Sequence, residues 1–191
     1  MHNISFSSAR RSGLFRRGFT LIELMIAVVI IGILASIAVY GVRKYVLQSK
    51  TAEARSMITD IMGAQETYKT ETFAYLNVTP DSDTYYPAQL DTSGQVAVQW
   101  GGTGCSNCLE NFQTLGVSPD GPVYFRYSVV AAPSGALSAG SGITYTLPDP
   151  GRWWYVVKAA SDLDGSGDGV PYTVFAASSE RSEIIVSNPG N

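Results

Sequence analysis

The chain has 191 residues, of which 15% are charged, and its formal net charge is −3. From Phe19 onward, 9 Lys and Arg residues stand against 16 Asp and Glu residues, so this part has a net charge of −7. It lacks the basic surface that generic nucleic-acid binding requires, so we expect no direct nucleic-acid partner. The single histidine, His2, precedes Gly18, so a chain without its first 18 residues has no Ser-His, Cys-His or His-ligated metal chemistry.

The first predicted element is an apolar helix over residues 19–42. These 24 residues are almost wholly apolar and contain one acidic residue, Glu23. At about 1.5 Å per residue they span roughly 36 Å, enough to cross the ~30 Å hydrocarbon core of a bilayer. Arg43 and Lys44 follow the run, but four arginines precede it, so the positive-inside rule places the amino terminus in the cytoplasm and the body outside. These four are Arg10, Arg11, Arg16 and Arg17.

The residues RRGFTLIELMIAVVIIGILASIAVY, at positions 16–40, resemble the class III prepilin signal of type IV pilins and type II secretion pseudopilins. The resemblance rests on the basic leader, Gly18, Phe19, Glu23 and the uninterrupted apolar helix. It implies that a membrane prepilin peptidase cuts between Gly18 and Phe19 and methylates the new amino terminus, so that Phe19 becomes an N-methylphenylalanine. One position departs from the family pattern, because Tyr40 stands where family members commonly have a proline.

The carboxylate of Glu23 is unusual in a segment that crosses a membrane. Near the centre of a bilayer an acidic residue costs about 2.5–3.5 kcal/mol, so it needs a partner. Cleavage after Gly18 creates a cationic amine on Phe19, about one helical turn away. The resemblance implies an assembly salt bridge, in which Glu23 of one subunit neutralises the Phe19 amine of the next as the fibre grows. The alternative is that Glu23 only reaches the cytoplasmic headgroups.

The helix is predicted to continue beyond the membrane, from Phe19 to about Phe73, because no proline interrupts residues 19–79. Its second half is amphipathic, with apolar residues at steps of three and four: Ala54, Met57, Ile58, Ile61, Ala64 and Tyr68. The predicted organisation is a cleaved basic leader over 1–18, a membrane-spanning and assembly half of the helix over 19–42, an amphipathic half over 43–75, and a globular β-rich head over 76–191.

The head is predicted to contain several strands, which are rich in β-branched and aromatic residues and bounded by Gly, Pro and Asp. They are Val96–Trp100, Pro122–Ala132, Trp153–Ala160, Tyr172–Ser178 and Glu183–Ser187. The small residues of positions 132–142 predict an exposed, mobile loop. Antiparallel strands packed on the apolar face of the long helix give an α+β fold, and the resemblance implies the lollipop shape of a pilin.

Cys105 and Cys108 are the only cysteines, and outside the cytoplasm a structural disulfide between them is the default expectation. Thiol oxidoreductases place a similar pair at a helix start in a βαβ setting, which the sequence does not indicate here. Two thiolates without a histidine make a poor zinc site. The closed loop is short, so we expect the disulfide to rigidify one surface loop at the low end of the ~2–4 kcal/mol range.

The sequence DLDGSGDG begins at Asp162 and concentrates three carboxylates in seven residues. Asp162, Asp164 and Asp168, with Ser166 and backbone carbonyls, supply the oxygen ligands that calcium prefers. An EF-hand requires a glutamate at loop position 12, which is absent here. The alternative is a glycine-rich turn between two strands. The sequence leaves a structural calcium site and a solvated turn open.

Three functions are compatible with these features. The preferred one is a structural subunit, not an enzyme, that polymerises with identical subunits into a type IV pilus used for adhesion, twitching motility or DNA uptake. The resemblance implies a prepilin peptidase and an inner-membrane assembly platform as partners. It also implies residence in the cytoplasmic membrane with the head outside before assembly, and in a surface filament afterwards. The alternatives are a pseudopilin of a type II secretion system and a membrane-tethered thiol redox protein that uses Cys105 and Cys108.

Overall fold

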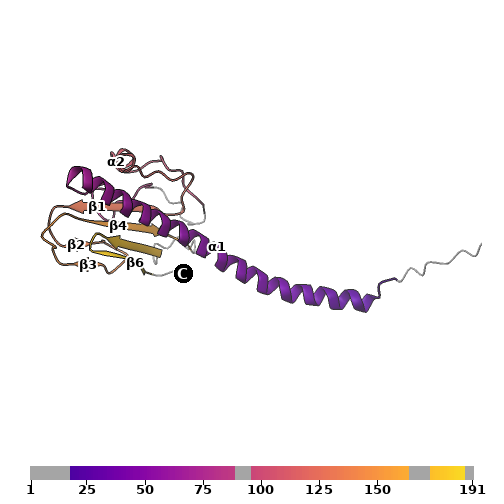
Figure 1. Cartoon of the computed structure of the whole chain (residues 1–191). Helices are drawn as coiled ribbons and strands as arrows, with labels where there is room; N and C mark the ends of the chain where they lie inside the picture. Colours follow the sequence, from indigo (N-terminus) through magenta and orange to yellow (C-terminus); the bar gives the residue numbers. More distant parts are fainter. Residues whose placement is uncertain (1–17, 89–95, 164–172, 188–191) are drawn as a thin grey trace, which may run out of the picture. The chain divides into compact units, whose positions relative to one another are not determined.

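The computed structural model describes residues 18–88, 96–163 and 173–187 (Figure 1). The long helix predicted from Phe19 to Phe73 is confirmed as α1, Leu21–Thr72. The chain divides into two compact units, Met1–Arg43 and Lys44–Asn191, which are described separately. In the described part of the first unit, residues 21–43 are helical and every side chain is exposed. Among the described residues, α1 is the one helix that is long and apolar enough to cross a membrane.

The second unit is built on a four-stranded antiparallel sheet with the order β1-β4-β5-β6. Its strands are β1 (Arg126–Ala132), β4 (Trp154–Ser161), β5 (Thr173–Ser178) and β6 (Arg181–Ser187). The register pairs Val129 with Val157 and Ala159 with Phe175. A helix packed on an antiparallel sheet is the α+β fold that the sequence predicts.

Both faces of this sheet are covered, which explains why every residue of β4 and β5 is buried. On one face, Ile58 and Ile61 of α1 belong to a core cluster with alternate residues of the strands, including Val157. On the other face, a second cluster contains Leu137 and Tyr145 together with the strand residues of opposite orientation. The residues that cover this second face belong to the chain between β1 and β4. This chain forms the short strand pair β2 (Leu137–Ser138) and β3 (Thr146–Leu147).

The prediction of a mobile, exposed loop over 132–142 is therefore wrong at its apolar positions. Leu137 and Ala139 are fully buried. The predicted strand Val96–Trp100 is also wrong, because among its residues only Val98 forms an isolated bridge, with Val123. The strand predicted over Pro122–Ala132 begins four residues later than expected, at the start of β1.

A short helix, α2 (Cys108–Thr114), was not expected from the sequence. Seven residues are too few to show an amphipathic period, which is the signal that identifies longer helices. The cysteine pair therefore does stand at a helix start, contrary to the prediction. Among the described elements no βαβ unit surrounds it, because α2 is followed by β1, whose sheet is antiparallel.

Candidate assembly motif and disulfide clamp

The start of α1 is closed by a reciprocal cap between Thr20 and Glu23. The Thr20 hydroxyl accepts a hydrogen bond from the backbone N–H of Glu23 at 3.2 Å. Glu23 Oε2 in turn accepts from the backbone N–H of Thr20 at 2.8 Å and from its hydroxyl at 2.7 Å. This is a capping box, which satisfies donors that a helix start otherwise leaves unpaired. The Thr-x-x-Glu spacing is its sequence signature, and the sequence interpretation of Glu23 missed it.

The cap uses only one oxygen of the Glu23 carboxylate. Within the described residues, Oε1 has no hydrogen-bond partner, while Oε2 takes both bonds from Thr20. Phe19 stands just before the helix with 84% of its surface exposed. In this structure Gly18 is still joined to Phe19, so Phe19 has no free amine for Glu23 to bind. The Phe19–Glu23 salt bridge predicted between subunits therefore stays a prediction.

The apolar side chains that follow this motif have no protein partner in the first unit. Every large apolar side chain between Phe19 and Val42 is at least 51% exposed. Each such side chain gains roughly 1.5–3 kcal/mol when it leaves water. A surface of this kind requires lipid or other helices around it.

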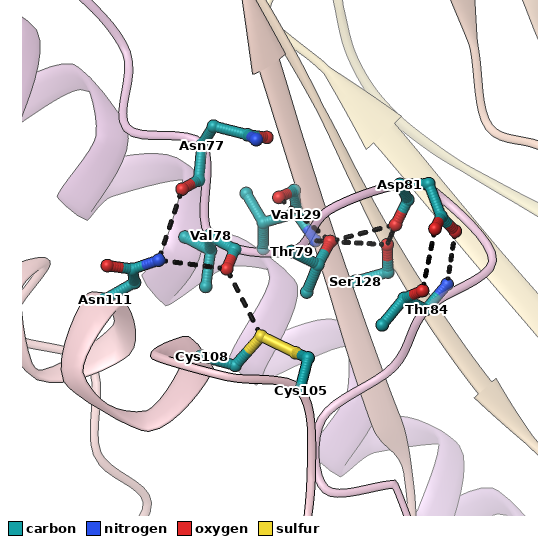
Figure 2. Close-up of a disulfide and its surroundings, with 10 residues drawn as sticks. All are labelled: Asn77, Val78, Thr79, Asp81, Thr84, Cys105, Cys108, Asn111, Ser128 and Val129. Atoms are coloured by element: carbon teal, nitrogen blue, oxygen red, sulfur yellow. Dashed lines mark hydrogen bonds between the residues drawn. A yellow bond between two sulfur atoms is a disulfide. The ribbon is translucent and has the colours of Figure 1, made fainter.

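Cys105 and Cys108 form a disulfide at the start of α2 (Figure 2). Cys108 is fully buried, and its sulfur lies 3.3 Å from the carbonyl oxygen of Val78. The side-chain amide of Asn111, one turn further along α2, donates to the same carbonyl at 3.1 Å. The disulfide thus does more than stiffen a surface loop, because it places α2 against the chain that leaves α1.

The residues held by α2 continue directly onto the sheet. The backbone N–H groups of Val78 and Thr79 both donate to the carbonyl oxygen of Val129 in β1, at 3.1 and 2.9 Å. The Thr79 hydroxyl lies 3.1 Å from the Ser128 hydroxyl. Figure 2 draws this contact as a dashed line. The disulfide, α2, residues 78–79 and β1 therefore form one connected set of contacts, which we call the disulfide clamp.

A partly buried carboxylate, Glu53, joins α1 to the start of β1. Its Oε1 accepts a hydrogen bond from the backbone N–H of Tyr124 at 2.9 Å. Burial raises the pKa of Glu53, and the bonds from the backbone of Tyr124 and Phe125 oppose that shift only in part. Burial, together with the nearby Glu53 carboxylate, also raises the pKa of the Tyr127 hydroxyl.

Of the four predicted calcium ligands, only Asp162 falls within the described residues. It follows β4 directly and is 7% exposed. Asp164, Ser166 and Asp168 lie outside the described residues. Among those that the structure describes, no group of three or more His, Cys, Asp or Glu residues is placed to hold a metal ion.

Comparison with known proteins identifies the amino-terminal motif. A family described as "Prokaryotic N-terminal methylation motif" matches residues 15–39. The type IV major pilin protein PilA of Myxococcus xanthus is 48% identical over 59 residues, which are 31% of this chain and 27% of that protein. The type II secretion system core protein G of Pseudomonas aeruginosa is 47% identical over 58 residues, 30% of this chain and 41% of that protein.

These two matches thus span less than half of either relative. A longer match extends into the head, because a fimbrial protein of Pseudomonas aeruginosa is 31% identical over 144 residues, 72% of this chain and 83% of that protein. No solved structure matches the chain significantly. The motif at Gly18, Phe19 and Glu23, the long apolar helix and the antiparallel head agree with these similarities. The chain belongs to the family of type IV pilins and pseudopilins.

Proposed function

We propose that the chain is a pilin that polymerises through α1 into a type IV pilus. The observation that carries this proposal is the run of exposed apolar side chains behind Phe19 and Glu23. The match to a fimbrial protein, which covers 72% of this chain, supports a pilus subunit over other members of the family. Before assembly the apolar run resides in the cytoplasmic membrane with the head outside, and in the filament the same run packs against copies of itself.

The proposed pathway begins with a prepilin peptidase, which cuts between Gly18 and Phe19 and methylates the amine of Phe19. An inner-membrane assembly platform then adds the subunit to the filament. Glu23 of one subunit neutralises the Phe19 amine of the next, because an unpaired carboxylate and an unpaired amine are both costly in an apolar bundle. The free Oε1 of Glu23 supports this role, because the carboxylate can accept a further donor without giving up the cap. Adhesion, twitching motility or DNA uptake would be properties of the resulting filament.

The test is production of the full chain in cells that have a type IV pilus machinery but lack their own major pilin. We expect sheared surface filaments whose main protein begins at a methylated Phe19 by mass spectrometry. Glu23→Ala should insert into the membrane at the wild-type level and yield no filaments. Glu110→Ala, at an exposed carboxylate on α2, is the matched control and should assemble normally. A mature chain that begins elsewhere, or wild-type filament yield from Glu23→Ala, would overturn the proposal.

A second candidate function is that of a pseudopilin, which is supported by the similarity to core protein G of a type II secretion system. It shares cleavage, membrane storage and helix bundling with the pilin proposal, but predicts only a short fibre. Long filaments on the cell surface at native expression support the pilin. Restored secretion in a strain that lacks its major pseudopilin, without long surface filaments, supports the alternative.

A calcium ion bound by Asp162, Asp164, Ser166 and Asp168 is a separate proposal, which rests on the sequence. Three carboxylates within seven residues repel one another unless a cation is present, whereas a solvated turn tolerates them. Calcium at this position would tie the end of β4 to the start of β5.

A further inference from the structure

A groove of about 430 Å³ lies along one flank of α1 in the second unit. Glu53, Met57 and Asp60 of α1 form one wall, and the residues from Val117 to Asp120 form the other. Three of its lining residues are acidic and none is basic. We call this feature the acidic groove and define it by Glu53, Asp60 and Asp120.

Two of the three carboxylates in the acidic groove have no hydrogen-bond or ion-pair partner among the described residues. Glu53 accepts the hydrogen bond from Tyr124, but Asp60 and Asp120 are exposed and have no hydrogen-bond or ion-pair partner among the described residues. Among the residues that the structure describes, no Lys or Arg lines the groove. The groove is therefore open to a positive group from outside.

The sheet of the second unit contains one basic residue, Arg181, that is available to bind the acidic groove of another molecule. Among the described residues of this unit, most basic side chains contact a partner. They are Lys50 over Tyr124, Arg55 over Phe175, Lys69 and Arg126 over Tyr75 and Tyr85, Arg152 with Glu180, and Lys158 with Asp83. Arg181, the first residue of β6, is exposed, and its guanidinium has no such contact within the described part of the chain. Lys44 is the other described basic residue of the unit without such a contact. It is the first residue of the unit and lies in α1, not in the sheet.

Arg181 lies on the opposite flank of α1 from the acidic groove. Ser179, in the turn before Arg181, and Ser182, just after it, line a second groove. Met62 and Gly63 of α1 line the same groove. Met62 is five residues after Met57, which is about 140° around a helix axis. The core-facing residues Ile58 and Ile61 come between these two flanks. In Figure 1, α2 and β6 are correspondingly drawn on opposite sides of α1.

We propose that the acidic groove binds the turn that bears Arg181 from a second copy of this chain. A groove and a turn on opposite flanks of one helix cannot bind each other within a molecule, but they can do so between neighbours. Two different surfaces that bind in this way form a heterologous interface, which repeats without closing and so generates a filament. The inference rests on the proposed pilin function and adds the head contact that sets how adjacent subunits are placed.

Cross-linking tests which surfaces meet. Because Cys105 and Cys108 are joined in a disulfide, the chain has no free cysteine that would compete. In filaments of the variant Asp120→Cys with Arg181→Cys, a short bifunctional maleimide should give a ladder of covalent oligomers. Each single variant should give monomers only. The matched control, Glu110→Cys with Arg181→Cys, should give at least about tenfold less oligomer, and an equally strong ladder from it would overturn the proposal.

Charge exchange tests whether the attraction matters. Asp120→Arg and Arg181→Glu, each alone, should lower filament yield by about tenfold, because each replaces an attraction by a repulsion. The combination of both changes should restore the yield. Glu71→Arg, an exposed carboxylate of α1 outside the groove, should assemble as the wild type does. Resistance of the detergent-solubilised full chain to protease shows that each variant is folded.

The outcomes separate this inference from the function on which it rests. If the wild-type chain forms no filaments, the proposed function fails and the docking proposal with it. If the wild type forms filaments and Asp120→Arg does so equally well, the pilin function stands and the docking of Arg181 in the acidic groove is wrong. If both single changes weaken assembly and the exchange restores it, the docking is supported.

Discussion

Lys158, on the central strand β4, has its side chain only 1% exposed, and its ammonium lies 2.8 Å from the carboxylate of Asp83. The same ammonium donates to the carbonyl oxygen of Ser141 at 3.1 Å. Asp83 also accepts from the backbone N–H and the hydroxyl of Ser141, at 2.9 and 2.7 Å. One buried cation thus joins the chain after α1 to the chain between β2 and β3.

We expect Asp83→Asn to destabilise the protein more than Lys158→Met does. Removing the carboxylate leaves a buried ammonium without a counter-charge, which typically costs about 3–5 kcal/mol. We expect the lower end of this range, because half of the Asp83 side chain is exposed. Lys158→Met removes the buried charge and leaves Asp83 with Ser141. Thermal unfolding of the full chain in detergent at pH 7 measures the difference, and the opposite order would contradict this account.

Acid should weaken the same contact. Burial alone raises the pKa of Asp83, but the hydrogen bonds from Lys158 and Ser141 outweigh it, so the pKa of Asp83 is lowered overall. A carboxyl whose folded pKa lies below its unfolded value of about 3.9 stabilises the fold above that pH. This stability is lost as the pH falls through the folded pKa. The melting temperature of Asp83→Asn should therefore approach that of the wild type below about pH 4, and a gap that stays constant to pH 2 would argue against it.

Glu53 should show the opposite dependence on pH. Its pKa is raised, chiefly by burial, so the folded state binds its proton more tightly than the unfolded state does. The wild type then loses stability as the pH rises from about 4.3 through the folded pKa. Glu53→Gln keeps an acceptor for the Tyr124 N–H and removes this loss. Its melting temperature should exceed that of the wild type at pH 7 and match it near pH 4, and a difference independent of pH would refute the assignment.

The disulfide should contribute modestly to stability and have no redox activity. Closing a loop as short as that between Cys105 and Cys108 restricts the unfolded chain by about 2 kcal/mol. Replacing both cysteines by serine should lower the melting temperature and loosen α2, since Cys108 is buried against Val78. Hydrogen exchange at Val78 and Thr79 should accelerate, because they depend on the disulfide clamp. Insulin reduction by the wild type would instead support a thiol redox protein.

Calcium titration decides between the two interpretations of the Asp162–Gly169 segment. If Asp162, Asp164 and Asp168 bind calcium, saturating calcium should raise the melting temperature of the full chain, because a ligand that binds only the folded state stabilises it. Asp164→Asn with Asp168→Asn should abolish the increase. Asp149→Asn is the control and should retain the increase, because among the described residues this carboxylate accepts only from the backbone of Gly151. If calcium does not raise the melting temperature of the wild type, the segment is a solvated turn and not a calcium site.

The elements with strong periods could be predicted from the sequence. The period of three and four in Ala54, Ile58 and Ile61 predicted the packed half of α1. Runs of apolar and β-branched residues predicted β4, β5 and β6 to within two residues. The motif of Gly18, Phe19 and Glu23 predicted the family, because the combination of a basic leader, a glycine and an intramembrane carboxylate is specific.

Contacts that depend on distant residues could not be predicted. Leu137 stands among glycines, serines and alanines, so nothing local shows that it covers the second face of the sheet. Lys158 is a single charged residue in an apolar strand, and its partner Asp83 is 75 residues away in sequence. The Thr-x-x-Glu spacing of Thr20 and Glu23 indicates the cap, whereas the membrane context of Glu23 predicted only the Phe19 amine as its partner.

The reciprocal cap at Thr20 has a consequence for the moment at which two protomers join. A side chain that is already immobilised has little rotational freedom left to lose, so in the proposed pathway Glu23 would bind the Phe19 amine of the next subunit in a fixed orientation. The Oε1 atom of Glu23 can accept a hydrogen bond from that amine while Oε2 keeps its bonds to Thr20 and so maintains the first helical turn. Filament elongation would then proceed without unwinding the amino-terminal turn of α1 in the subunit whose Glu23 binds the next subunit.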